Sequence, residues 1–503
     1  MATITGTDGD DTLIGNPESD VIRGLGGNDI LHGGASRDLL DGGPGNDVLN
    51  GGSGDDIYSA VDAGDSINED ADAGFDEVTT ALATYVLGAN LEMLTAVSSG
   101  PHDFRGNALG NLISGNSEND ILRLQDGGGD NARGLHGDDI FYLGAAFDNW
   151  DRVDGGEGND TLVLQGDYML SIAPGTIARI DGISLQSRTV TRWGQSGTNS
   201  YDYALTLSEA VAQAGVQLRI NAQSLQAGED LTFDGSAETD GGRFLVYGGF
   251  GTDRLTGGAG NDIFFFEGGR FGAGDRVDGG GGADAVVISG ASPVTIEAGA
   301  FTQIEALSFS GRFASDSAAR PSYDVALHDG NIAPGGTLIV NASSLEPDQT
   351  LSFDGSAVSD GRLRIFGGAG GDTLKGGAND DAIQGGGLGD ALQGGGGEDR
   401  FVYSGLGDSS GTARDVIADF EIGVDKIDLV AVDADISSAG DDAFRFVGES
   451  AFSGTAGELR LAFDAQAGRW SVQGDVSGDM AIDFELLVSS GGTAPLTAPD
   501  FIL

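Results

Sequence analysis

The chain has 503 residues, with 79 acidic and 25 basic side chains, and its formal net charge is -54 at pH 7. This excess of negative charge argues against binding to nucleic acids or anionic membranes, and it opposes compaction until counter-ions bind. The sequence has no cysteine, which excludes disulfides and thiolate metal sites, and no apolar run approaches the ~18 residues of a transmembrane helix.

Residues 6–59 consist of six consecutive nine-residue units: GTDGDDTLI, GNPESDVIR, GLGGNDILH, GGASRDLLD, GGPGNDVLN and GGSGDDIYS. The eighth position is always large and apolar. A strand alternates its side chains, so only this residue points inward, and the glycine-rich turn reverses the chain. Two units then complete one coil. The sixth position is always aspartate, and each of these residues stacks on the one 18 positions later: Asp11, Asp20, Asp29, Asp38, Asp47 and Asp56.

Stacked carboxylates repel one another unless a cation lies between them. A carboxylate together with turn carbonyls gives an adaptable, all-oxygen cage, which suits Ca²⁺ better than Mg²⁺ or Zn²⁺. One buried apolar side chain per unit cannot offset the chain entropy lost on folding. We therefore expect this block to fold only with calcium, and we expect a coil-like far-UV spectrum in chelator.

The pattern G-G-x-G-x-D-x-U-x resembles the RTX (hemolysin-type calcium-binding repeat) family. The resemblance implies a parallel β-roll, with several Ca²⁺ ions held by the aspartates and by main-chain carbonyls of the turns. It also implies export of the unfolded chain through a type I secretion apparatus, followed by folding in extracellular calcium. The start of the sequence, MATITGTDGD, lacks the basic and apolar regions of a cleaved signal peptide, as that route would lead us to expect.

Residues 60–133 read as a β spacer with degenerate repeats, with strands expected over 77–80 and 91–96. The unit at 106–114 carries Asn111 where aspartate is expected, so it should ligate weakly or not at all. The unit GNSENDILR adds Asp120, and GLHGDDIFY resumes the motif with Asp139.

A long internal duplication follows, over 134–260 and 261–366. LRINAQSL (218–225) matches LIVNASSL (338–345), and LTFDGSA (231–237) matches LSFDGSA (351–357). Short apolar runs between turns favour β-solenoid coils, with a small inserted β-sandwich as the alternative. Four aspartates in this region are further candidate calcium ligands: Asp160, Asp253, Asp262 and Asp284.

Residues 367–402 form a second clean block, with candidate ligands Asp372, Asp381, Asp390 and Asp399. Residues 403–503 resemble the C-terminal domain of serralysin-type proteases. The resemblance implies a cap over the solenoid edge and further sites at Asp415 and Asp425. The final residues, Asp500-Phe-Ile-Leu503, resemble an uncleaved signal for type I secretion.

The predicted fold is all-β: calcium-bound parallel β-roll or β-solenoid blocks, β-rich spacers and a C-terminal capping β domain. The predicted segments are an N-terminal RTX β-roll, a spacer, two duplicated solenoid units, a second RTX β-roll and the cap: 1–59, 60–133, 134–260, 261–366, 367–402 and 403–503.

Catalytic motifs are weak in this sequence. The repeats begin at residue 6, which within this chain leaves no preceding stretch for a catalytic domain. None of the four histidines, His32, His102, His136 and His328, lies in an HExxH motif. One GxSxG string occurs at 407–411, but no histidine follows it, so we interpret it as structural.

The sequence therefore predicts a secreted, non-enzymatic calcium-binding protein that acts as an extracellular or cell-surface scaffold. Its partners would be the type I secretion apparatus, further copies of itself in a sheet or filament, or a cell-surface polysaccharide. One alternative is a β-helix lyase or epimerase acting on polysaccharides, for which we name Asp151, Arg152, Tyr201, Asp275, Arg276 and Tyr323. Another is a ligand-binding or ice-binding solenoid, which calls for threonine arrays that the sequence does not sustain.

Overall fold

A computed structural model describes residues 1–59, 61–194, 197–209, 211–212, 214–290, 293–311 and 320–503. The chain divides into two compact units, Met1–Phe244 and Leu245–Leu503. Among the described residues the only helical elements are two 3₁₀ turns, η1 (Leu406–Asp408) and η2 (Ala498–Asp500). In the described part of the chain, no helix has the length and apolarity needed to cross a membrane.

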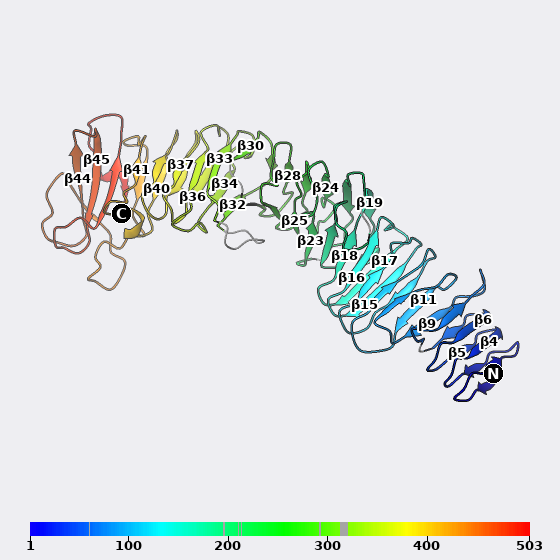
Figure 1. The fold of residues 1–503 in the computed structure, drawn as a ribbon. Coiled ribbons are helices and arrows are strands. Elements are labelled where there is room, and N and C mark those ends of the chain that lie inside the picture. Colours follow the sequence, from blue (N-terminus) through cyan, green and yellow to red (C-terminus); the bar gives the residue numbers. More distant parts are fainter. Residues whose placement is uncertain (60, 195–196, 210, 213, 291–292, 312–319) are drawn as a thin grey trace. The chain divides into compact units, whose positions relative to one another are not determined.

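The first unit is a solenoid of short parallel strands, visible as the stacked arrows from β4 to β19 in Figure 1. From Ile22 onward, the apolar residue in the middle of each repeat strand is buried, and the residues on either side of it are half-buried or exposed. One sheet contains β1 (Thr3–Thr5), β3 (Val21–Arg23), β5 (Leu39–Asp41), β7 (Ile57–Tyr58), β9 (Glu77–Thr80), β11 (Met93–Ala96), β13 (Leu112–Ser114), β15 (Asn131–His136), β17 (Arg152–Glu157) and β20 (Ile177–Ala178).

Three further groups of parallel strands complete the coils of this unit. The first contains β2 (Thr12–Ile14), β4 (Ile30–Ala35), β6 (Val48–Ser53) and β8 (Ser66–Asn68). The second contains β10 (Thr84–Val86), β12 (Asp103–Arg105), β14 (Ile121–Arg123), β16 (Ile140–Gly144), β18 (Thr161–Leu164), β21 (Gly182–Leu185) and β23 (Gln217–Asn221). The third contains β19 (Tyr168–Ile172), β22 (Tyr203–Leu207) and β24 (Leu231–Asp234).

The core of the first unit is a stack of inward side chains in exact coil register. Ile22 pairs with Leu40, Leu40 with Tyr58 and Tyr58 with Val78, and all four are buried. The predicted period of two units per coil is therefore confirmed, since β3 and β5 align residues 18 positions apart. The spacer continues this stack, because β9 and β11 pair with each other and β9 pairs with β7.

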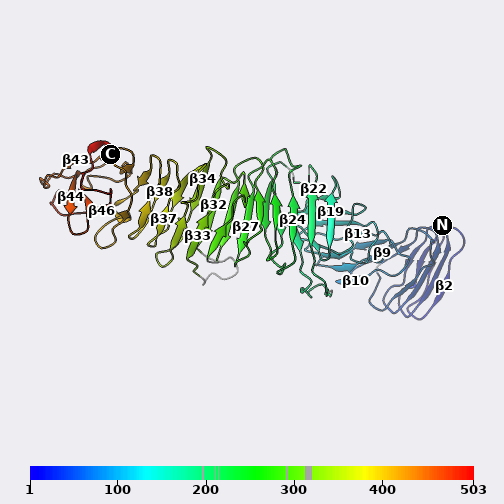
Figure 2. The ribbon, with the colours of Figure 1, turned by 90° about the horizontal axis from the view of Figure 1, so that it is seen from above.

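The second unit continues the same architecture, as the parallel strands from β27 to β38 in Figure 2 show. One group contains β25 (Arg243–Tyr247), which pairs from Leu245 onward, β27 (Ile263–Glu267), β29 (Ala285–Ser289), β32 (Ala306–Ser310), β34 (Thr337–Asn341), β36 (Arg362–Phe366), β38 (Ala382–Gln384), β40 (Arg400–Val402), β42 (Lys426–Asp428) and β47 (Phe501–Ile502).

Two other groups of strands complete the coils of the second unit. The shorter contains β26 (Arg254–Thr256), β28 (Arg276–Asp278) and β31 (Phe301–Thr302). The longer contains β30 (Val294–Ile296), β33 (Tyr323–Leu327), β35 (Leu351–Asp354), β37 (Thr373–Lys375), β39 (Ala391–Gln393), β41 (Val416–Ile417), β46 (Phe484–Val488), β45 (Arg469–Asp475), β44 (Glu458–Asp464) and β43 (Arg445–Gly448).

The duplicated segments form wide solenoid coils, so the alternative of an inserted β-sandwich is wrong. Both copies use the same tyrosine in the same way. The Tyr203 hydroxyl donates to the Gln186 carbonyl at 2.7 Å, and the Tyr323 hydroxyl donates to the Ser310 carbonyl at 2.7 Å. The strands on either side are parallel in both copies.

The pairing pattern changes near the C-terminus. β44 and β46 both pair with β45 in antiparallel orientation, whereas β46 joins the last solenoid strand β41 in parallel. The end of the sequence is part of this region, because β47 pairs with β42 and Asp500 accepts a hydrogen bond from the Gly423 amide at 2.8 Å. The predicted all-β solenoid with a C-terminal β cap is thus confirmed.

Candidate metal centre

The repeat aspartates form ladders along each unit. The backbone N–H of an aspartate donates to Oδ1 of the aspartate in the next coil: Asp20 to Asp38 at 2.6 Å, Asp29 to Asp47 at 2.7 Å and Asp38 to Asp56 at 2.7 Å. In the second unit, Asp372 donates to Asp390 and Asp381 to Asp399 in the same way. One oxygen of each carboxylate is thereby fixed, and the other is turned into the glycine-rich turn.

The second oxygen, Oδ2, occurs in two states. In the first state it accepts the backbone N–H four residues earlier, as Asp20 accepts from Asn16 at 2.8 Å. Eight of the predicted ligands have such a capped Oδ2: Asp11, Asp20, Asp120, Asp253, Asp262, Asp372, Asp381 and Asp425.

In the second state Oδ2 is buried and has no hydrogen-bond partner among the described residues; we call this an open Oδ2. It is found at nine predicted ligands, Asp29, Asp38, Asp47, Asp56, Asp139, Asp160, Asp284, Asp390 and Asp415. Asp399, the remaining predicted ligand, is also buried, and its Oδ1 accepts from Asp381 at 2.9 Å. A buried acceptor that lacks a donor costs free energy, and a bound cation removes that cost.

The backbone four residues before the aspartate decides between the two states. Gly34, which precedes Asp38, has φ +114°, and this conformation turns its N–H away from the carboxylate. Leu25 and Leu135 adopt the same conformation before Asp29 and Asp139, with φ +79° and +82°. A leucine in this region is strained, so the turn geometry is held there at an energetic cost.

The space beside an open Oδ2 is lined by a second oxygen. A Cβ placed on Gly33 would lie 2.7 Å from Asp38 Oδ2 and 2.5 Å from the Gly51 carbonyl oxygen of the next coil. Only glycine leaves this room, and both atoms that border it are hard oxygen donors. The residues present therefore fit Ca²⁺, which takes carboxylate and carbonyl ligands at about 2.3–2.6 Å.

Burial shifts the titration of the open carboxylates. It raises the pKa of Asp56, Asp139 and Asp284 to about 7 and that of Asp390 to about 8, and neighbouring carboxylates add to the effect. The backbone amides of Asn16 and Ala2, by contrast, lower the pKa of the capped Asp20. An open carboxylate is thus costly to ionise unless a cation accompanies it.

Asn111 occupies a ladder position with its side chain fully used. Its Oδ1 accepts from the Asn107 amide at 2.8 Å, and its Nδ2 donates to the Asn107 side-chain oxygen at 3.1 Å. Its main-chain N–H still donates to Asp130 at 2.8 Å. Asn111 therefore donates a ladder bond to the next coil through its backbone, but its side chain offers no charge to an ion.

Several ladder residues lie outside the nine-residue pattern and were missed by sequence reasoning. They accept the ladder hydrogen bond from the preceding coil: Asp65, Asp76, Glu92, Asp130, Asp151, Asp181, Asp275 and Glu305. The signal that finds them is an acidic residue two positions before the buried residue of a strand, as in Asp76-Glu77-Val78.

Two of the residues named for a polysaccharide enzyme, Asp151 and Asp275, are members of these ladders. Asp151 accepts from the amides of Asp130 and Asp148, and Asp275 accepts from those of Asp253 and Gly272. The Tyr323 hydroxyl is buried in its bond to Ser310. Asp151, Asp275 and Tyr323 thus support the coils that contain them.

Ser409, the central residue of the GxSxG string, is also structural. It is fully buried, its hydroxyl donates to the Glu485 carbonyl at 2.5 Å, and the same oxygen accepts from the Asp415 amide at 2.9 Å. The serine therefore joins Asp415, which accepts the ladder bond from Asp390, to β46.

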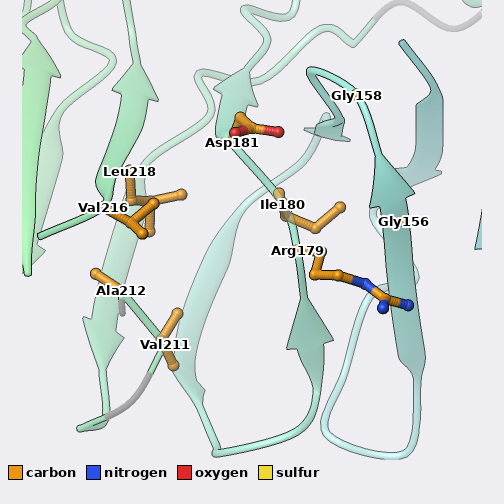
Figure 3. Close-up of a pocket in the computed structure, with 9 residues that line it drawn as sticks. All are labelled: Gly156, Gly158, Arg179, Ile180, Asp181, Val211, Ala212, Val216 and Leu218. Carbon is orange, nitrogen blue, oxygen red and sulfur yellow. The ribbon is translucent and has the colours of Figure 1, made fainter. Parts of the chain in front are cut away.

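Figure 3 shows a cavity of about 220 Å³ in the first unit, lined largely by glycine and aliphatic residues. Its charged groups are Arg179 and Asp181, and both are engaged. Arg179 Nε donates to Asp154 at 2.8 Å, and Asp181 accepts the ladder bond from Asp160 at 2.8 Å. In Figure 3, Arg179 extends toward the strand that carries Gly156, while Val216 and Leu218 lie on the opposite side.

The fold and the ladders together define a calcium-binding β-solenoid. The family described as RTX calcium-binding nonapeptide repeat matches residues 5–40, 23–58 and 245–270, and the family described as Peptidase M10 serralysin C terminal matches residues 279–503. The chain therefore carries RTX calcium-binding repeats and a serralysin-type C-terminal region, and the cofactor of such repeats is Ca²⁺ in several copies.

The chain is also similar to the metalloprotease AprA of Pseudomonas entomophila (strain L48), with 38% identity over 97 residues. The match spans 19% of this chain and 19% of that protein. The shared part is thus about a fifth of either sequence.

Proposed function

We propose that this protein is a secreted, non-enzymatic scaffold of the extracellular space or cell surface that folds when it binds calcium outside the cell. The observation that carries the proposal is the repeated open Oδ2, a buried carboxylate oxygen without a hydrogen-bond donor among the described residues. It recurs in both units, at Asp29, Asp38, Asp47, Asp56, Asp139 and Asp160 in the first and at Asp284, Asp390 and Asp415 in the second. A body in which many coils need a cation responds to calcium as a folding signal.

We assign the ions to the turns with an open Oδ2. At Asp38 the carboxylate and the Gly51 carbonyl of the next coil border a common space, and at Asp160 the carboxylate and the Arg179 carbonyl do so. The capped residues act differently. In the first coil of the N-terminal block, Asp11 and Asp20 are held by backbone amides, so they begin a ladder without completing a site.

Assembly into sheets or filaments is supported by the strands at the sheet ends. β1 and β2 each lie at the end of their sheet, with one side unpaired among the described residues. A strand edge of this kind is a template for another chain. The partner that the scaffold role favours is therefore a second copy of this protein, brought in once calcium has ordered the edge.

The test is a calcium titration of the full chain from chelator into millimolar Ca²⁺. Far-UV circular dichroism should show β structure appearing cooperatively near ~0.1–1 mM, the range of extracellular modules. Sedimentation and electron micrographs of the same samples should show assemblies only with calcium. A chain that stays monomeric and adheres to nothing at high calcium would contradict the scaffold role.

A second candidate follows from the named relative, which is a metalloprotease. A proteolytic role would require a metal site in this chain outside the calcium ladders. Incubation of the calcium-loaded protein with casein and Zn²⁺ tests this directly. We expect no cleavage, since the four histidines lie outside an HExxH motif.

A further inference from the structure

Three carboxylates from separate elements converge where the N-terminal block passes into the spacer. Asp56 precedes β7, Glu69 follows β8 and Asp76 precedes β9. One oxygen from each lies within 4.8 Å of the others. Glu69 has no counterpart in the nine-residue pattern, so this cluster differs from the repeat turns.

Each of these carboxylates is oriented through one oxygen and unpartnered at the other. Asp56 Oδ1 accepts from the Asp38 amide at 2.7 Å, Asp76 Oδ1 accepts from the Asp56 amide at 2.8 Å, and Glu69 Oε1 accepts from the Tyr58 hydroxyl. The second oxygens of all three are buried and lack a hydrogen-bond partner among the described residues. Asp56 and Asp76 are 0% and 1% exposed.

The surroundings keep this space open and hold Glu69 in place. Tyr58 accepts a hydrogen bond from the Gly51 amide at 2.9 Å and donates its own proton to Glu69. A Cβ on Gly51 would overlap Asp56 Oδ2, Tyr58 Oη and Glu69 Oε1. Glycine at 51 therefore creates the room into which the oxygens point.

Electrostatics favour a cation at this point whenever the three carboxylates are ionised. Burial raises the pKa of Asp56 and of Glu69 to about 7, and Asp76 adds to both shifts by its charge. Burial likewise raises the pKa of Asp76. Asp38 and Asp55 also face the cluster and carry the same sign. Three ionised groups in so small a buried volume repel strongly without a cation.

We propose that Asp56, Glu69 and Asp76 form a Ca²⁺ site that closes the N-terminal repeat block, with Tyr58 as a positioning residue. Oxygens on opposite sides of a calcium ion lie about 4.6–5.2 Å apart, which agrees with the spread of this cluster. Three carboxylates, each able to bind through one or both oxygens, suit the six to eight ligands of Ca²⁺. The site shares Asp56 with the repeat ladder and to that extent rests on the proposed calcium-dependent folding.

The experiment compares full-length Glu69→Gln with the wild type and with Glu18→Gln, whose carboxylate is exposed and pairs with the N-terminal amine. Bound calcium per chain is measured by equilibrium dialysis at fixed free Ca²⁺. We expect Glu69→Gln to bind one ion fewer than the wild type and Glu18→Gln to bind the same number. The Asp76→Asn variant should lose the same single ion.

An unchanged calcium count in folded Glu69→Gln would overturn this inference and leave the proposed function intact, whereas a wild type that bound no calcium would overturn both. If Glu69→Gln fails to fold at any calcium concentration, Glu69→Asp, which keeps the charge, must restore calcium-dependent folding. If it does not, Glu69 acts only by filling space. Tyr58→Phe should weaken the site by several-fold without removing the ion, because the hydroxyl orients a ligand and is not one itself.

Discussion

Two kinds of coil stand side by side in the first unit, and they are stabilised by different means. A repeat coil such as that of β3 and β4 buries one aliphatic side chain per strand, whereas β22 buries Tyr203, Leu205 and Leu207 together. Each buried large side chain contributes about 1.5–3 kcal/mol. The wide coils therefore have an apolar core of their own, and the repeat coils need their ions.

The strongest test of this comparison is removal of calcium. In chelator we expect residues 24–59 to lose their structure, while β22 and β24 of the wide coils keep theirs. Hydrogen exchange read by mass spectrometry measures both in one sample. In chelator, the repeat block would then be coil-like, as its sequence predicts, whereas the far-UV spectrum of the whole chain would still show some β structure. Equal protection of the two regions in chelator would contradict the comparison.

A pair of ladder substitutions tests the difference between open and capped carboxylates. Asp38→Asn should raise the calcium concentration at the folding midpoint by about tenfold or more, which corresponds to about 1.4 kcal/mol. Asp20→Asn should change it by less than about twofold, because the backbone already satisfies that carboxylate. Calcium titrations followed by circular dichroism give both midpoints. Equal calcium midpoints for Asp38→Asn and Asp20→Asn would show that the open Oδ2 of Asp38 does not bind the ion.

The pH dependence should have opposite signs with and without calcium. Burial raises the folded-state pKa of Asp139 and Asp284, which lie outside the repeat block at 24–59, to about 7, well above the unfolded value. Without calcium, the stability of the coils that contain them is therefore greatest at low pH and falls as the pH rises through about 7. Calcium competes with these protons, so its affinity should rise over the same interval. Thermal unfolding from pH 5 to 8.5, with and without calcium, checks both trends.

The two equivalent tyrosines of the wide coils allow a matched comparison. Tyr203→Phe and Tyr323→Phe each remove a buried hydroxyl that donates at 2.7 Å to a carbonyl. We expect each to lower the free energy of unfolding by about 1 kcal/mol. The calcium midpoint of the repeat block should not move. Unequal costs for the two variants would mean that the duplicated coils are not energetically equivalent.

The smallest expected effect concerns Leu25, whose φ is +79° in the turn before Asp29. Leu25→Gly relieves about 1–2 kcal/mol of backbone strain in the folded state. It also increases the conformational entropy of the unfolded chain, which lowers the free energy of unfolding by about 0.5–1 kcal/mol. The net change should be a slight decrease in the calcium midpoint. A marked increase would show that the leucine side chain itself supports the turn.

Sequence periodicity predicted the repeat coils because it is a local property. The coil register and the inward residues Ile22, Leu40 and Tyr58 all follow from the nine-residue phase. The ladder members outside that phase could not be read in this way. Coil length varies, so Asp56 contacts Asp76 across 20 positions, and Asp76 contacts Glu92 across 16. Those pairings depend on how each turn folds.

The nine-residue pattern also does not predict which carboxylates are open and which are capped. Asp47 and Asp372 both sit in glycine-rich turns, yet only Asp47 has an open Oδ2. The difference lies in a backbone angle, since Gly43 has φ +85° and the amide of Gly368 is instead turned toward its aspartate. A glycine permits either conformation, so its presence alone does not predict which one forms.

The direction of the ladder bonds also indicates the order in which the coils fold. Within the ladders, each aspartate amide donates to a carboxylate later in the chain, as Asp20 does to Asp38, so the acceptor for one coil is supplied by the coil that follows it. For Asp390 and Asp399 those acceptors are Asp415 and Asp425, at the start of the C-terminal region. We therefore expect order to spread from that region toward lower residue numbers, with the C-terminal coils serving as the template for the rest.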